Sequence, residues 1–109
     1  RLQRIYLLFP DPWPKRRHRE RRFTGRANLD ALARGMADNA ELRIASDEMG
    51  YIRWTLENSR LHPDLAWLAR RPQDWRQPPA DWIPTRYQEK AIKAGRNPIY
   101  LAFRRRPRA

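Results

Sequence analysis

Two aspartates each come soon after an apolar run of strand length. Asp11 follows the run Ile5–Phe9, and Asp47 follows the run Leu42–Ser46. The segment between the runs has helical spacing, so the order strand, helix, strand predicts a βαβ unit with two parallel, neighbouring strands. Open α/β sheets bind ligands beyond the carboxyl ends of such strands. The sequence therefore predicts a site at one sheet edge to which both carboxylates contribute.

A strongly basic segment leaves this same edge. Six of the eight residues from 15 to 22 are Lys or Arg. Like charges repel, whereas a phosphate backbone neutralises them and releases counterions, so a phosphate-binding role is favoured over a solvated charge run. His18 has no Cys or second His nearby, which favours a hydrogen-bonding or phosphate role, and no metal site is predicted. A phosphate chain lying on this segment would bring a base towards the acids, as a nucleic-acid-modifying enzyme requires.

The composition agrees with a nucleic-acid partner. The 109 residues, 40% of them hydrophobic, suffice for one domain with a core, and the net charge of +12 favours nucleic acid first and an anionic membrane second. The absence of cysteine excludes disulfides and thiolate metal sites. No apolar run approaches the roughly 18 residues of a membrane span, and no signal-peptide pattern opens the chain. We therefore expect a cytoplasmic protein without a membrane partner, and a start at Arg1 rather than Met suggests a piece of a longer chain.

The first half is predicted to be regular. The continuous apolar run Ile5–Phe9 is typical of a strand buried on both faces of a parallel sheet. Thr24 is placed to cap the helix that follows, and this helix is expected to end near residues 38–39. Its apolar face is formed by Leu29, Leu32, Ala33 and Met36.

The second half mixes regular and irregular segments. A helix is predicted from Glu48, with Met49, Ile52 and Leu56 on one face. Prolines and tryptophans over residues 71–84 predict an irregular loop. A short helix over residues 85–94, closed by Gly95, and a strand over residues 99–103 complete the chain. We expect this last strand to be antiparallel to its neighbour.

Simpler interpretations of the same features remain open. Residues 10–14, with three prolines around Asp11 and Trp13, could form no more than a rigid turn. Asp47 could cap the next helix. The cations Arg86, Lys90 and Lys93 share one helical face, which a solvated surface explains equally well.

The segments FPDPWPKRRHRERR and TRYQEKAIKAGR resemble the bacterial tRNA (guanine-N7)-methyltransferase family. Members of this family methylate guanine 46 in the variable loop with S-adenosylmethionine. The resemblance extends over essentially all 109 residues and corresponds to the C-terminal half of such an enzyme. It implies an α/β fold in which residues 1–109 form one partial domain, the C-terminal half of a Rossmann-like class I S-adenosylmethionine-dependent methyltransferase domain.

The resemblance also implies roles for individual residues. Asp11 matches the central acid, near both the methyl donor and the guanine, and therefore a catalytic and cofactor-binding residue. Lys15 and Asp47 match substrate contacts. Further substrate contacts are implied for Thr85, Arg86, Tyr87 and Gln88, and RNA contacts for Arg17, His18, Arg19, Arg21 and Arg22. The family has Glu where this chain has Gln88, which keeps an acceptor oxygen and lacks the charge.

Methylation at N7 makes modest chemical demands. The N7 atom of guanine carries a lone pair and no proton, so its attack on a sulfonium methyl needs alignment and a suitable field, and no general base. Asp11 or Asp47 can accept hydrogen bonds from guanine N1–H and the N2 amino group, and their charge favours the cation that forms. Trp13 is placed either to stack on the base or to serve as core or lid.

The chain lacks one expected part of such an enzyme. Its four glycines form no glycine-rich loop for a nucleotide-like cofactor, so most of the S-adenosylmethionine site is expected before Arg1. We therefore expect the 109 residues alone to be inactive and to leave one sheet edge open for the missing half or another copy. Two alternatives are a non-catalytic basic RNA-binding module and, because of Gln88, a degenerate paralogue that binds without methylating.

Overall fold

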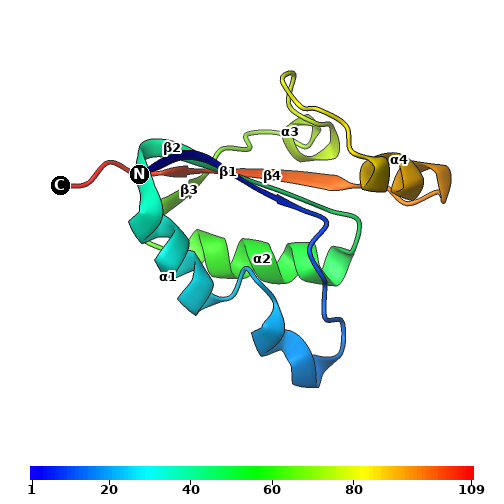
Figure 1. Cartoon of the computed structure of the whole chain (residues 1–109), viewed down its shortest axis with the longest axis horizontal. Helices are drawn as coiled ribbons and strands as arrows, with labels where there is room; N and C mark the ends of the chain where they lie inside the picture. The colour runs from blue at the N-terminus through cyan, green and yellow to red at the C-terminus, as the bar shows by residue number, and fades with distance from the viewer.

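A mixed sheet of four strands forms the centre of the molecule (Figure 1). The computed structural model describes all residues from 1 to 109. The strands are β1 (Leu2–Leu8), β2 (Met36–Ser46), β3 (Leu65–Trp67) and β4 (Ile99–Arg105), in the order β1-β2-β4-β3. β1 and β2 are parallel, and β4 is antiparallel to both β2 and β3. The predicted βαβ unit and the antiparallel last strand are thus confirmed.

Helices lie on both sides of this sheet. The two longer ones, α1 (Arg26–Gly35) and α2 (Met49–Leu61), lie on one side, and the short α3 (Gln73–Arg76) lies on the other (Figure 1). The helix α4 (Arg86–Lys93) lies at the end of the sheet where β1 and β2 terminate, and the 3-10 helix η1 (Arg16–Arg21) lies beyond α2, on the side of the sheet that carries the two longer helices. No helix is long and apolar enough to cross a membrane.

The core lies between the sheet and the two longer helices. Side chains alternate along β2, so Leu42 and Ile44 are buried with Phe103 of β4, while the intervening Arg43 extends to the opposite face. Tyr51 and Ile52 close the core from α2. Each such apolar side chain contributes roughly 1.5–3 kcal/mol on burial. The core therefore fixes the faces of the sheet and the direction in which its strands end.

The loop between α3 and α4 covers the other face. Trp82 packs edge-on against Tyr6 of β1 and Tyr100 of β4, with ring centroids 5.9 and 5.2 Å away. Asp81 accepts hydrogen bonds from Arg43, at 2.8 Å, and from Arg4, at 3.1 Å. The bond from Arg43 is the main cause that lowers the pKa of the Asp81 carboxyl. This loop is therefore tied to three strands.

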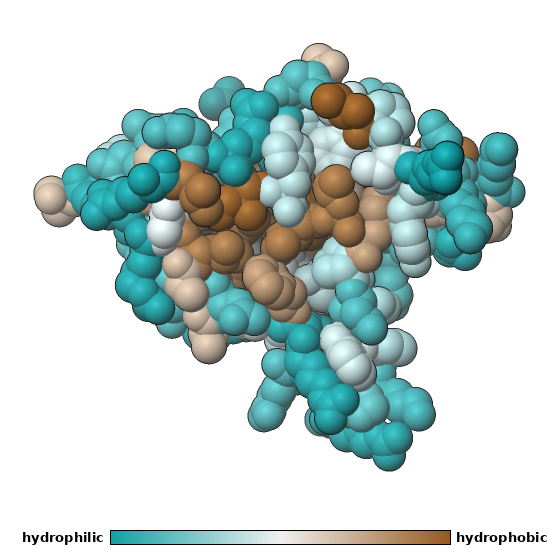
Figure 2. All heavy atoms as spheres, in the orientation of Figure 1, coloured by the Kyte–Doolittle hydropathy of each residue, from teal (hydrophilic) through white to brown (hydrophobic).

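β1 departs from the prediction in its burial. Tyr6 and Leu8 are exposed and Ile5 and Leu7 only half-buried, so burial on both faces is wrong for this chain. The reason is topological, because β1 is an edge strand that pairs with β2 alone. Apolar atoms gather at the centre of the face drawn in Figure 2.

The boundaries of α1 also differ from the prediction. Gly25 occupies the N-cap position, and the buried Thr24 instead shares a 2.7 Å hydrogen bond with the hydroxyl of Thr55. The helix ends at Gly35 rather than near residues 38–39, which belong to β2. Asn39 has φ 65°, where the register between β1 and β2 shifts. Because Asn39 is typical of a turn, the sequence predicted only the second half of β2, Leu42–Ser46.

The later elements follow the prediction more closely. Glu48 caps α2, Thr85 caps α4, and Gly95 takes φ 79° just after α4, a conformation that favours glycine. α3 lies within the loop predicted for residues 71–84, and β3 was not predicted at all. α3 has four residues and β3 has three, which are too few for a periodic pattern in the sequence.

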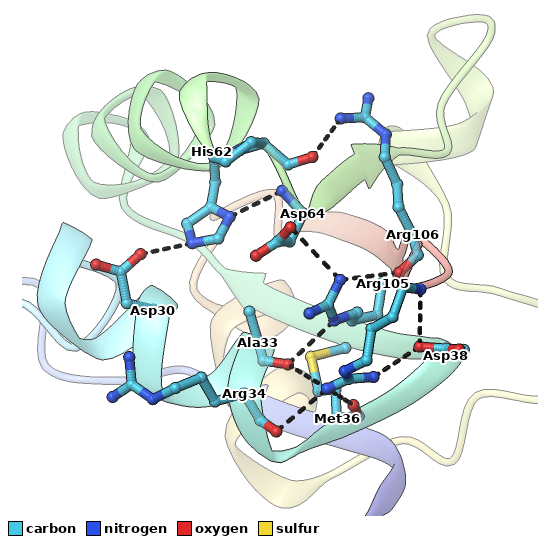
Figure 3. A network of polar contacts seen from close by, with 11 residues as sticks. Asp30, Ala33, Arg34, Met36, Asp38, His62, Asp64, Arg105 and Arg106 are labelled. Carbon is cyan, nitrogen blue, oxygen red and sulfur yellow. Dashed lines mark hydrogen bonds and ion pairs between the residues drawn. The ribbon is translucent and has the colours of Figure 1, made fainter.

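The C-terminal arginines are structural (Figure 3). Arg105 is buried, and its Nε donates to the carbonyl of Ala33, in the last turn of α1. Arg108 donates to the carbonyls of Arg34 and Met36 and pairs with Asp38. These guanidiniums bind the otherwise unpaired carbonyls at the negative end of the helix dipole. The basic tail is therefore partly engaged in holding α1 to the sheet.

We expect Arg105→Ala to lower the free energy of unfolding by roughly 1.5–3 kcal/mol, because a buried hydrogen bond from a charged donor is lost. The matched control is Arg104→Ala, since Arg104 is the exposed neighbour on the opposite face of β4 and makes no side-chain hydrogen bond. Urea unfolding of both variants measures the difference. Equal stability of the two variants would contradict the role given to Arg105.

Candidate active site at the carboxyl edge of the sheet

Asp11 lies on a tight turn directly after β1. The amide of Phe9 makes the last hydrogen bond towards β2, to Ala45 O at 2.7 Å, and Phe9 then takes φ 49°. Asp11 Oδ1 accepts from the amide of Trp13 at 3.1 Å, and Trp13 has φ 42°. Such bulky residues at positive φ cost on the order of 1–3 kcal/mol each and cluster at functional sites. Prolines and this hydrogen bond restrict the backbone here, and Asp11 is exposed just past the end of β1.

Asp47 lies at the same edge, directly after β2. Capping of α2 belongs to Glu48, whose carboxylate accepts from the amides of Gly50 and Tyr51, so the interpretation of Asp47 as the helix cap is wrong. Asp47 is half-buried, and its Oδ2 accepts from Nε of Arg96. Its Oδ1 has no hydrogen bond within the chain and is open to another donor. Sequence reasoning missed Arg96, because 49 positions separate the two partners.

A cavity of about 240 Å³ joins the two strand ends. Its walls are Phe9, Pro10, Pro12, Ser46, Asp47, Glu48, Tyr87 and Arg96. The ring of Tyr87 packs on that of Phe9 at 5.0 Å, which brings α4 to the end of β1. Asp11 stands between two prolines of the wall but does not itself line it. The cavity is smaller than the roughly 300–1,000 Å³ of typical small-molecule pockets, so it suits one ring system rather than a whole cofactor.

The basic segment follows the Asp11 turn and forms an exposed surface. Its cations Lys15, Arg16, Arg17, Arg19 and Arg21 are exposed and take part in no ion pair. The Arg21 guanidinium stacks on Trp13 at 5.0 Å, and the half-buried His18 meets the same ring edge-on at 5.4 Å. The indole of Trp13 therefore links η1 to the turn that carries Asp11.

Arg22 differs from the rest of the basic segment. It is 4% exposed, and its Nε donates to the carbonyl of Pro12 at 2.9 Å. Its guanidinium also stacks on Trp54 of α2 at 5.1 Å. The structure thus places Arg22 inside the molecule, where it fastens the Asp11 turn to α2, and not on the exposed surface expected to meet RNA.

The start of α4 separates its residues into two groups. Thr85 Oγ1 accepts from the amide of Gln88, and Gln88 is buried with its Oε1 accepting from Trp82 Nε1 at 2.8 Å. The side chains of Thr85 and Gln88 therefore serve the cap and the loop. Arg86 and Tyr87 are exposed, and Arg86, Lys90 and Lys93 surround Tyr87 without any ion pair.

The chain carries only part of what a bound cofactor or metal would need. No three His, Asp or Glu side chains lie close enough together to hold a metal ion. The turn after β1 contains no glycine, so it offers no close backbone approach to a nucleotide. The exposed Asp11 can accept hydrogen bonds from a ligand lying against β1, whose outer edge is unpaired. The residues present fit one wall of a cofactor site.

Comparisons with known proteins agree with this geometry. Residues 1–101 match the family described as "Putative methyltransferase". The chain belongs to this methyltransferase family. Its mixed α/β sheet of four strands is accordingly part of a Rossmann-like methyltransferase domain.

Three similar proteins carry the name tRNA (guanine-N(7)-)-methyltransferase. The protein from Rhodospirillum rubrum is 61% identical over 108 residues, which is 99% of this chain and 42% of that protein. The protein from Ruegeria pomeroyi is 51% identical over 104 residues, 95% of this chain and 44% of its own length. The protein from Chelativorans sp. is 50% identical over 102 residues, which is 94% of this chain and 44% of that protein. This member of the methyltransferase family thus spans less than half the length of these relatives.

We expect Arg22→Ala to loosen the Asp11 turn, because the carbonyl of Pro12 loses its donor and Trp54 loses its stacked cation. The backbone amide of Trp13, which donates to Asp11 Oδ1, should exchange with deuterium at least tenfold faster, since a hydrogen bond from a charged donor contributes roughly 1.5–3 kcal/mol. The exposed neighbour Arg19→Ala is the control and should leave this exchange unchanged. Unchanged exchange in Arg22→Ala would show that the turn needs no such support.

Proposed function

We propose that the protein containing this chain is a cytoplasmic enzyme that transfers a methyl group from S-adenosylmethionine to N7 of guanine 46 in tRNA. The observation that carries the proposal is that Asp11 and Asp47 follow the ends of two neighbouring parallel strands, at a cavity that Asp47 lines, while the cations of η1 and α4 form no ion pair. The names of the similar proteins support it.

The residues of the site act on the guanine by position and charge. S-adenosylmethionine supplies a methyl group on a sulfonium, which the N7 lone pair can attack. Asp47 Oδ1 is available to accept from the N1–H and N2 amino groups, while Tyr87 and Phe9 offer rings beside the base. The two carboxylates also favour the positive charge that the purine gains as the methyl group leaves the sulfur. No proton has to be removed.

The open edge of β1 supports a division of labour between two parts of the protein. β1 pairs on one side only, and its exposed Leu2, Tyr6 and Leu8 form an apolar surface that solvent does not favour. We propose that residues outside this chain cover that edge and carry most of the cofactor site, with Asp11 at the boundary. Pairing with a second copy of the chain is the alternative occupant.

The cations of η1 and α4 support tRNA as the partner. Those of η1 follow the Asp11 turn in the chain, and those of α4 lie next to Tyr87, which lines the cavity. Because neither group is neutralised within the chain, a phosphate backbone can contact both. Lys15, Arg17, Arg19, Arg21 and Arg86 are thus proposed to bind RNA.

A second candidate function is RNA binding without methylation. The observation that favours it is the burial of Gln88, whose side chain contacts Trp82 and not the cavity. In that case the carboxylates would be dispensable, and only the basic surfaces would matter. Effects of carboxylate substitutions on product formation separate the two functions.

We expect Asp11→Asn in the full-length protein to lower kcat for methylation of unmodified tRNA by roughly 10²–10³-fold, as is typical when one electrostatic group at a transition state is removed. Binding of tRNA should stay within about twofold, since Asp11 neutralises no phosphate. Methyl transfer from labelled S-adenosylmethionine measures the rate. The control is the exposed Glu57→Gln on α2, and an unchanged rate for Asp11→Asn would refute the proposed mechanism.

We expect the pair Lys90→Gln and Lys93→Gln to weaken tRNA binding and flatten its salt dependence. The slope of log K against log salt should fall by about 0.9 for each phosphate contact removed, hence by about 2 for both. Fluorescence anisotropy of labelled tRNA over a series of KCl concentrations measures it. The pair Arg34→Gln and Arg60→Gln, on α1 and α2, is the control. A slope identical to that of the control would show that Lys90 and Lys93 contact solvent and no phosphate.

A further inference from the structure

A second, larger cavity adjoins the candidate active site. Its volume is about 560 Å³, more than twice that of the first and within the roughly 300–1,000 Å³ of ligand pockets. It is lined by Asp47, Met49, Trp75, Arg76, Arg96, Asn97, Pro98 and Ile99. Neither the sequence motifs nor the proposed roles of Asp11 and Asp47 account for it.

The ion pair between Asp47 and Arg96 is the common wall of the two cavities. Both residues line the first cavity at the ends of β1 and β2, and both line the second at the end of β2 and the start of β4. The cavities are therefore neighbouring compartments along the carboxyl edge of β2. A ligand that extends beyond the first compartment reaches the second across this pair.

The lining of the second cavity suits a nucleotide. Trp75 is half-buried and packs against the core, so its indole is a fixed platform. Arg76 now stacks on that ring at 4.9 Å and has no carboxylate partner. Asn97 is exposed with no side-chain hydrogen bond, and Arg96 contributes a second guanidinium. An aromatic face, an amide and two arginines are the groups with which proteins hold a single-stranded nucleotide.

The order of the strands places the second cavity next to the first, on the side away from β1. The unpaired edge, where the rest of the methyltransferase domain is proposed to attach, is that of β1, and the second cavity lies beyond β2, at β4. The donor side, the first cavity, the ion pair and the second cavity thus follow one another along the sheet edge. Resting on the proposed function, we infer that the second cavity binds the nucleotide next to the target guanine, with its base on Trp75 and its phosphate at Arg76 and Arg96.

The test combines a substitution of Trp75 with tRNAs that lack one base. Trp75→Leu in the full-length protein is assayed with intact tRNA and with tRNAs made abasic at the nucleotide on either side of the target. Loss of base stacking on an aromatic ring should lower kcat/KM and affinity by roughly fivefold to a hundredfold. One of the two abasic tRNAs should show a similar loss with the unchanged protein, and no further loss with Trp75→Leu, while Trp75→Phe restores most of the binding.

Variants at two other residues of the second cavity test the inference independently of Trp75. Arg76→Ala and Asn97→Ala change exposed side chains and should weaken tRNA binding about three- to tenfold, whereas Arg60→Ala, on α2, should not. These two variants carry the test if Trp75→Leu fails to fold. Additive losses for Trp75→Leu and the abasic tRNAs, or affinities of Arg76→Ala and Asn97→Ala equal to that of Arg60→Ala, would overturn the inference. If the unchanged protein binds tRNA without methylating it, the proposed function fails, and anisotropy with the same abasic tRNAs still tests the subsite.

Discussion

The parallel pairing of β1 with β2 is the constraint on which the site depends. Its register, with Leu8 opposite Ala45 and a final hydrogen bond from Phe9 to Ala45, makes the two strands end together. Asp11 and Asp47 consequently reach the same edge although 36 positions separate them in the chain. The right-handed crossover through α1 keeps that edge clear, because the helix lies on a face of the sheet and not at its end.

The large positive charge of the chain divides into two parts that the sequence alone does not distinguish. Arg22, Arg43 and Arg105 are buried, and each uses its guanidinium on carbonyl or carboxylate oxygens of the chain. They fix a turn, a loop and a helix end, since a buried guanidinium must be hydrogen-bonded. The cations of η1 and α4 are exposed and form no ion pair within the chain, and the same is true of Arg34, Arg60 and Arg104 elsewhere. The net charge predicted a polyanionic partner, and the fold separates the arginines that serve the structure from those that are exposed.

Local signals predicted the parts of this site that adjoin the strand ends. Asp11 and Asp47 were singled out because each follows an apolar run, and α4 lies within the helix predicted over residues 85–94 and closed by Gly95. The contact of Arg96 with Asp47 and that of Trp82 with Gln88 depend on how the chain returns to the sheet, for which the sequence has no periodic signal. For β1 the sequence signal was present but misleading. Its apolar run is typical of a strand with neighbours on both sides, whereas β1 is an edge strand with exposed side chains.

The environment of Gln88 bears on whether its neutral side chain weakens the site. A carboxylate at this position could accept from Trp82 Nε1 as the amide does, but it would bury a charge with no cation bonded to it. The Gln88 side chain accepts the hydrogen bond from the indole of Trp82 without burying a charge. It thereby helps to hold the Trp82 loop against β1 and β4. The negative charge at the sheet edge comes from Asp11 and from Asp47, neither of which contacts Gln88. In this packing, therefore, Gln at position 88 preserves the scaffold and leaves both carboxylates of the site in place.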